Sequence, residues 1–277
     1  MLHNANRSLL YSDNILSFTS SILEKEYIIK VTISRDEKKL DVLLYKAAIK
    51  WTKTASKLYT VIVSTKDFFI NYKEPELMIE VLAAACREPL NNVNFLLNEN
   101  GTIYSILNYD EILEKWRAIK TDLLLRYGGE IVTNYIYLQD KVINDADLLL
   151  DKLKKDMFLH QFFYPLYNSV FVNFGLKVTE NSEFLNIPYE LPVVFLAKNE
   201  GRYDEKNELE FEKKLDMYYY NSEQMPVEKY EGVYRLNKDH SIKAIDCIFQ
   251  AFGQIMVFKV NELDTGLQPE IAINEMG

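Results

Sequence analysis

The order of apolar and polar positions divides the chain into three stretches with different periods. Apolar residues alternate with polar ones over short runs in residues 25–107 and again in residues 167–261, which is the period of β-strands. Between them, residues 108–164 carry apolar side chains at alternating spacings of three and four, the period of amphipathic helices. The pattern predicts an α+β fold, with two blocks of mainly antiparallel strands and a central three-helix segment.

The first block is predicted to consist of strands joined by tight turns. Asn100-Gly101 between two apolar runs is typical of a two-residue hairpin turn, because both residues tolerate positive φ. Pro75 is well placed in the first turn of a short helix, which Glu88-Pro89 would end. The expected elements are strands at 27–33, 40–50 and 58–64, a helix at 75–87 and a hairpin at 93–108.

The three central helices are predicted from their apolar faces. Asn108 would cap the first helix, with Glu111 completing a capping box, and Gly128-Gly129 would end it. The third helix would end before Pro165. The expected apolar faces are Ile112, Trp116, Ile119 and Leu123 in the first, Ile131, Tyr135, Leu138 and Val142 in the second, and Ala146, Leu149, Leu150, Leu153 and Met157 in the third.

The second block repeats the strand pattern up to a polar end. Residues 1–264 are predicted to form a single α+β domain, because no Pro/Gly/Ser-rich linker separates the two blocks. Residues 265–277 are expected to be a flexible tail. The expected strands are 169–178, 191–197, 208–220, 231–237, 242–250 and 254–261.

Residues 97–103 and 236–242 resemble each other in residue type at nearly every position. A duplicated half-domain would produce this similarity, and so would two unrelated hairpins with the same turn chemistry. The sequence leaves both explanations open.

Charge and cysteine content restrict the class of partner and the compartment. The net charge is −9, which opposes binding to nucleic acid and to anionic lipid, so neither partner is predicted. Cys86 and Cys247 are too few for a disulfide framework or a zinc site. Together with the lack of a continuous apolar N-terminal run, they predict a cytoplasmic location.

Candidate chemistry is sparse. No nucleotide-binding, nucleophile-elbow or metal-ligand motif occurs, so no catalytic residue, metal or cofactor is predicted. His160 is expected to hydrogen-bond the last carbonyls of its helix rather than to act as a titrating group. Cys86 and Cys247 lie in apolar patterns and are expected to be packed side chains.

Tyrosine is abundant, and Tyr218 and Tyr220 would share one face of a strand. Because tyrosine is enriched at interfaces, these two residues are the predicted partner-binding site. The leading hypothesis is a non-catalytic cytoplasmic protein-binding module, such as an immunity, adaptor or chaperone-like component of a bacterial system. Its partner would be another protein, and the acidic net charge would suit a basic one. Two alternatives remain: a binder of an apolar small ligand held between sheet and helices, and a hydrolase that uses scattered carboxylates.

Overall fold

Both strand-rich blocks belong to one antiparallel sheet. The computed structural model describes residues 16, 22–35, 39–54, 58–181, 183, 190–218 and 227–263. Within them eleven strands are hydrogen-bonded in the order β5-β4-β3-β2-β1-β11-β10-β9-β8-β7-β6. The strands are β1 (Ile22–Arg35), β2 (Lys39–Lys53), β3 (Tyr59–Ile70), β4 (Asn92–Leu97), β5 (Ile103–Ile106), β6 (Gly175–Asn181), β7 (Glu190–Ala197), β8 (Leu209–Leu215), β9 (Val227–Leu236), β10 (Ile242–Ala251) and β11 (Gln254–Glu262).

The α+β class predicted from the sequence is confirmed, but the separation into two blocks is not. The first and last strands pair with each other, from Tyr27 opposite Glu262 to Arg35 opposite Gln254, and this pairing joins the blocks in the middle of the sheet. Strands so far apart in the sequence carry no local signal of their pairing, because strand periodicity reports which side chains point inward and not which strands are neighbours.

The helices also differ in detail from the prediction. They are α2 (Met78–Arg87), α3 (Tyr109–Arg126), α4 (Glu130–Ile143), α5 (Ala146–Lys154) and α6 (Met157–Phe162). The expected third helix is therefore two helices. The break follows from Asp156, whose carboxylate accepts a hydrogen bond from the backbone N–H of Leu159 at 3.0 Å and so caps a new helix.

The apolar face of α4 lies one position away from the predicted one. Ile131 and Leu138, which the prediction placed in the core, are 78% and 59% exposed. The buried side chains of this helix are Val132, Ile136 and Ile143. Both sets satisfy helical spacing, so the sequence alone did not distinguish the buried face from the exposed one.

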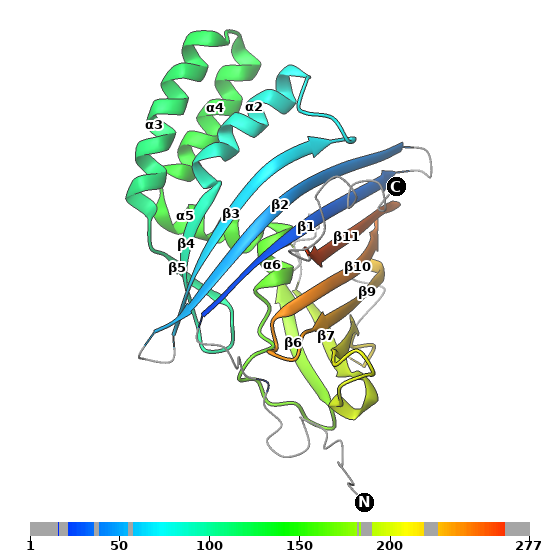
Figure 1. Cartoon of the computed structure of the whole chain (residues 1–277). Coiled ribbons are helices and arrows are strands. Elements are labelled where there is room, and N and C mark those ends of the chain that lie inside the picture. Colours follow the sequence, from blue (N-terminus) through cyan, green and yellow to red (C-terminus); the bar gives the residue numbers. More distant parts are fainter. Residues whose placement is uncertain are drawn as a thin grey trace, which may run out of the picture.

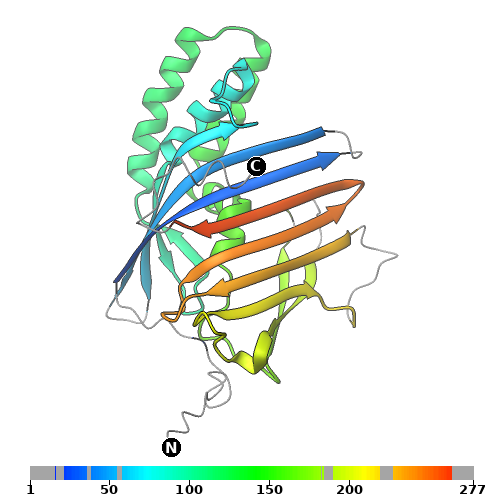
Figure 2. The ribbon, with the colours of Figure 1, turned by 45° about the vertical axis from the view of Figure 1, so that its right-hand side comes forward.

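The sheet curves around α6, and Figure 1 shows this helix between the strands of the two halves. The aromatic rings of α6 and the residues after it contact both halves. Phe162 packs against Tyr27 of β1, with ring centroids 5.0 Å apart, and Tyr164 packs against Phe195 of β7 at 4.6 Å. The helix therefore fills the concave side of the sheet and forms the centre of the core, while α2 to α5 lie at one end of the sheet (Figures 1 and 2).

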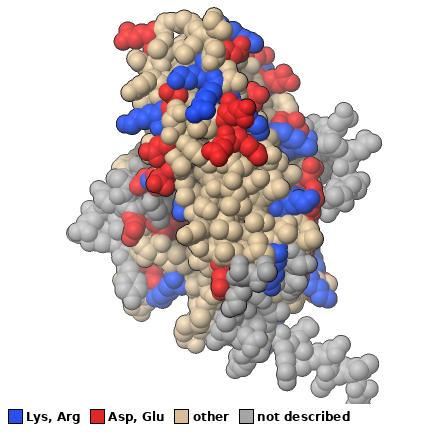
Figure 3. All heavy atoms as spheres, turned by 90° about the vertical axis from the view of Figure 1, so that its left-hand side faces the viewer, with Lys and Arg blue, Asp and Glu red and all other residues tan. Residues whose placement is uncertain are grey.

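Charged side chains of both signs gather over the helical end of the molecule (Figure 3). The surface below them on that view shows few charges.

The two similar sequence segments form turns with the same hydrogen bonds. The N–H of Asn98 donates to the Thr102 carbonyl at 2.9 Å, and the N–H of Asn237 donates to the Ser241 carbonyl at 2.9 Å. Tyr167 joins the two turns, because its N–H reaches the Asn100 carbonyl at 3.3 Å and its hydroxyl donates to the His240 carbonyl at 2.9 Å. Shared turn chemistry is therefore established, and it is compatible with either origin.

Candidate functional site

A pocket of about 400 Å³ lies where the two outermost strands of the sheet approach α5 and α6. Ile103 comes from β5, at one end of the strand order, and Val178 comes from β6, at the other. The pocket lies at the seam between these two ends of the strand order. We call it the seam pocket; it is lined by Asn98, Thr102, Ile103, Asp151, Lys154, Lys155, Leu159, His160, Phe163, Tyr164, Pro165, Val178, Thr179 and Glu180.

The inner wall of the seam pocket is apolar and its outer wall is polar. Ile103, Leu159 and Phe163 are buried members of the hydrophobic core. Asp151 and Lys154, from the exposed side of α5, stand at the outer wall. The lining is therefore mixed, with five apolar residues among fourteen, and it offers both apolar surface and polar groups to a ligand.

A buried ion pair lies directly behind the pocket wall. The Lys213 ammonium lies 2.9 Å from Glu180 Oε2, and the two side chains are 0% and 1% exposed. Lys213 also donates to Gln161 Oε1 at 2.7 Å. The Glu180 carboxylate further accepts hydrogen bonds from the Gln161 amide at 3.1 Å and the Tyr164 hydroxyl at 3.1 Å. Every charge in this cluster has a partner, as burial requires.

Aromatic rings complete the surroundings of the lysine. The Lys213 ammonium lies 4.4 Å from the ring centroid of Tyr164 and 4.9 Å from that of Tyr230, with Phe195 slightly farther, at 5.6 Å. These distances allow cation–π attraction, which is strongest where water is excluded. Burial raises the pKa values of Tyr164 and Tyr230 well above the ordinary range, so both hydroxyls remain neutral.

The charge of Glu180 is maintained by its neighbours. Burial alone would raise the pKa of this carboxyl, but the Lys213 ammonium and the hydrogen bond from His160 outweigh burial and lower the pKa to about 2. The carboxylate is therefore ionised at neutral pH and has the properties of a structural anion. A general acid needs a raised pKa instead.

His160 connects this cluster to the pocket. Its Nε2 lies 2.8 Å from Glu180 Oε1, and its Nδ1 lies 3.1 Å from the backbone carbonyl oxygen of Lys154. Both neighbours are acceptors, whereas a neutral imidazole carries a single N–H, so the imidazolium form satisfies both contacts. The expected contact with a helix-terminal carbonyl exists, but the carbonyl belongs to α5, and the contact with Glu180 was not predicted.

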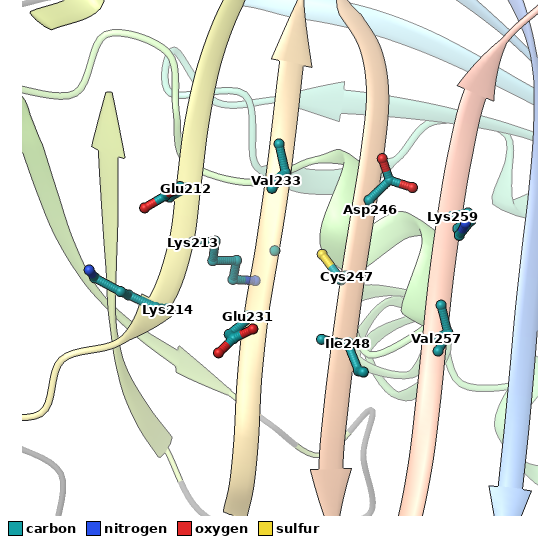
Figure 4. Close-up of a pocket in the computed structure, with 11 residues that line it drawn as sticks. Glu212, Lys213, Lys214, Glu231, Val233, Asp246, Cys247, Ile248, Val257 and Lys259 are labelled. Carbon is teal, nitrogen blue, oxygen red and sulfur yellow. The ribbon is translucent and has the colours of Figure 1, made fainter. Parts of the chain in front are cut away.

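A second hollow, of about 720 Å³, lies on β8 to β11 (Figure 4). Lys213 and Cys247 point into the core at this place, and their strand neighbours Glu212 and Asp246 point to the opposite face, as alternation requires. The carboxylates there pair with other surface charges; for example, Asp246 accepts a hydrogen bond from Arg235 at 2.9 Å. This hollow is an open surface of the sheet, lined by charged residues together with Val233, Ile248 and Val257.

The predicted partner-binding tyrosines are placed only in part. Tyr218 is 94% exposed and follows the end of β8 at Leu215, so it does not lie in a strand. Tyr220 lies outside the described residues. Cys86 and Cys247 are buried, as expected from their apolar neighbours, and burial raises their pKa values to about 11 and about 12.

Sequence reasoning missed Lys213 and Glu180, although each had a visible signal. Lys213 continues the inward-facing positions of Leu209 and Phe211, and Glu180 continues those of Leu176 and Val178. A charged residue at an apolar position of an alternating strand predicts a buried charge that needs a partner.

The described residues contain no group of three or more His, Cys, Asp or Glu side chains that could hold a metal ion. No helix among them combines the length and the apolar character needed to cross a bilayer.

Comparison with known proteins shows weak similarity of fold. No protein-family model and no curated protein matches the sequence. A lipovitellin structure described by its lipid–protein interactions is 11% identical over 90% of this chain, with a TM-score of 0.46, and this chain spans only 26% of it. A DUF1329 family protein from Desulfovibrio piger is 9% identical over 90% of this chain and 88% of its own, with a TM-score of 0.22.

A third structure is a domain assigned to an outer membrane lipoprotein-sorting protein from Vibrio parahaemolyticus, 7% identical over 91% of each chain, with a TM-score of 0.21. Neither of the last two structures is described as a cytoplasmic protein, so the cytoplasmic location predicted from the cysteines and the N-terminal residues is not retained. All three TM-scores are below 0.5, so the proposals below rest on the geometry of this chain.

Proposed function

We propose that this protein binds a small ligand with an apolar body and a polar end in the seam pocket. The observation that carries the proposal is the pocket itself, which measures about 400 Å³ between the two outermost strands and two helices. Sites for small molecules commonly measure about 300–1,000 Å³ and are mostly apolar with a few placed polar groups. The apolar body would contact Ile103, Leu159 and Phe163, and the polar end would face Lys154 and Asp151.

This proposal replaces the protein-binding module as the leading hypothesis. The aromatic residues of the segment 162–171 are largely core, because Phe162, Phe163 and Phe171 are buried. Buried rings cannot contact a partner. Of the two tyrosines predicted to bind a partner, only Tyr218 lies within the described residues, and it is exposed.

The pKa values of the carboxyl groups speak against the hydrolase alternative. Acid catalysis by a carboxyl group needs a pKa raised toward neutrality. Among the described residues, every carboxyl group with a resolved shift has a lowered pKa, namely Asp140, Glu180, Glu210 and Asp216.

The test uses a substitution that fills the seam pocket. Val178→Trp places a large ring at a partly exposed lining position, and Val172→Trp adds the same ring at a position that is 67% exposed and outside the lining. The probe is a dansyl-labelled fatty acid, whose fluorescence rises in an apolar site. We expect wild type and Val172→Trp to bind the probe alike and Val178→Trp to lose at least about tenfold in affinity, because the added ring displaces the ligand.

Circular dichroism and the urea midpoint verify that both variants remain folded. Equal probe binding by the three folded proteins would contradict the proposal, and so would absence of binding to wild type across fatty acids of different length.

A further inference from the structure

The end of the helical region farthest from β5 exposes six large apolar side chains. Three lie at the start of α2 and three around the turn between α3 and α4. Leu125 is 82% exposed and Ile131 is 78% exposed, values far above those of the core faces of the same helices. The six residues are Leu77, Met78, Ile79, Leu124, Leu125 and Ile131.

These side chains belong to one end of the molecule. Leu124 and Leu125 occupy the last turn of α3, and Ile131 occupies the first turn of α4, which follows after the short link 127–129. Figures 1 and 2 both place the beginning of α2 at the same end as this link. We call residues 73–80 and 122–131 the helical tip.

Such a cluster needs an explanation. Single exposed apolar residues are normal, but several together on a soluble protein mark a contact surface. The residues are not required by the fold either, because the core faces of α3 and α4 are formed by other side chains, such as Trp116 and Ile136.

The charges around the cluster limit what could cover it. The helical tip contains five carboxylates and two cations. One cation, Arg126, pairs with Asp122 at 2.8 Å, and Glu80 accepts the backbone N–H groups of Glu76 and Leu77, each at 3.1 Å. The five carboxylates are Glu74, Glu76, Glu80, Asp122 and Glu130, and the two cations are Lys73 and Arg126.

With two cations against five carboxylates, the helical tip has a net charge of −3, which repels an anionic membrane surface and the helical tip of a second copy. It attracts a segment that presents apolar side chains next to lysine or arginine. We propose that the helical tip is a docking surface for a basic amphipathic segment of a partner protein. The exposed Leu, Ile and Met side chains would pack against the apolar side of that segment, and the carboxylates would meet its cations. This surface is separate from the seam pocket, so either proposal can fail alone.

The experiment uses the full chain and two short, fluorescein-labelled amphipathic peptides. One is made of leucine and lysine, and the other has glutamate at every lysine position. We expect fluorescence anisotropy to show at least about tenfold tighter binding of the lysine peptide, with an affinity that falls as salt is added.

Variants then locate the binding. Leu125→Gln/Ile131→Gln should weaken binding of the lysine peptide about tenfold or more, because it removes the two most exposed apolar contacts. Val172→Gln is the control, since it changes an exposed apolar residue outside the helical tip, 67% exposed, and it should leave binding unchanged. Glu76→Gln/Glu130→Gln should weaken binding and reduce its dependence on salt.

Two further measurements test whether a membrane or a second copy of the chain covers the helical tip instead. Flotation with phosphatidylcholine vesicles and with phosphatidylglycerol vesicles measures membrane binding, and sedimentation velocity measures self-association. The proposal is overturned if Leu125→Gln/Ile131→Gln binds the lysine peptide as wild type does. It is equally overturned if that variant abolishes vesicle binding or self-association of the wild-type chain.

Discussion

The Lys213 ammonium and the Glu180 carboxylate lie 2.9 Å apart, and neither side chain is accessible to solvent. The pair links two strands, because Lys213 belongs to β8 and Glu180 belongs to β6. Gln161 of α6 and Tyr164, two residues after this helix ends, donate hydrogen bonds to the same carboxylate. The ion pair therefore holds the outermost strand and the central helix in place beside the seam pocket.

Removing one partner of this pair should be strongly destabilising. Lys213→Met leaves the Glu180 carboxylate buried without its cation, and we expect a loss of about 3–5 kcal/mol in the free energy of unfolding. Lys198→Met is the control. Its ammonium pairs with Glu210 on the surface, at 41% and 28% exposure, so its loss should cost about 0–1 kcal/mol.

The double variant Glu180→Gln/Lys213→Met separates the pair from its surroundings. With both charges removed, neither partner is left as an unpaired buried ion, so the double variant should be more stable than the sum of the single losses predicts. The double-mutant cycle is measured by urea denaturation of the wild type, Lys213→Met, Glu180→Gln and the double variant. Additive losses would show that the two charges do not interact.

The pH dependence of stability should follow the ionisation of Glu180. Its pKa is lowered from 4.5 to about 2, so the folded state holds the proton less tightly than the unfolded state. The stabilisation is then complete above the unfolded pKa of 4.5 and is lost as the pH falls toward about 2. Asp140 and Asp216 also have lowered pKa values and add to acid unfolding, so the informative quantity is the difference between wild type and Glu180→Gln.

That difference should stay constant above about pH 4.5 and shrink as the pH falls toward 2. Urea midpoints measured at several pH values provide it. A stability difference that does not change over this range would mean that the carboxyl has the same pKa in the folded and the unfolded protein.

Gly232 is required by close packing next to the ion pair. A Cβ atom at this position would lie 2.6 Å from the Cys247 sulfur and 3.5 Å from Lys213 Cβ. Gly232→Ala should therefore cost about 1–3 kcal/mol, which is typical of overpacking. At Gly128 a Cβ atom would meet no heavy atom within 4 Å, so Gly128→Ala serves as the matched control and should leave the urea midpoint nearly unchanged. Equal midpoints for the two variants would show that the strands adjust without cost.

Local features of this fold were accessible from the sequence, and long-range ones were not. The hairpin at Asn100-Gly101 forms because glycine accepts a φ of 90° there. Asn108 was expected to cap its helix with its side chain, but that side chain instead accepts the N–H of Asn94 at 2.9 Å and donates to the Asn92 carbonyl at 3.0 Å. A side chain with both donor and acceptor groups can bind a strand or cap a helix, and tertiary contacts decide between them.

At the site, too, the local features were predictable from the sequence and the long-range contacts were not. Alternation placed Lys213 and Glu180 at inward positions of their strands, which is sufficient to predict two buried charges. It could not predict that they meet, because that contact depends on β7 lying between β6 and β8 in the sheet. The seam pocket depends on contacts between segments still farther apart in the sheet, because β5 and β6 approach the same pair of helices from opposite ends of the strand order.

The two thiols should be unreactive in the folded protein. Burial raises the pKa of Cys86 to about 11 and that of Cys247 to about 12, and the thiolate is the reactive form. Treatment with iodoacetamide near neutral pH should therefore modify neither residue before unfolding and both residues in concentrated urea, as measured by intact mass.

The same measurement distinguishes the helical region from the sheet. Cys86 lies in α2, whereas Cys247 lies in β10, paired on both sides by β9 and β11. Helical segments at the edge of a domain can open without global unfolding, so Cys86 should become modified at lower urea concentrations than Cys247. Cys86→Ala and Cys247→Ala assign each mass change to its residue. Simultaneous modification of both thiols would show instead that the helices and the sheet unfold as one cooperative unit, and rapid modification before urea is added would contradict the burial of the thiol concerned.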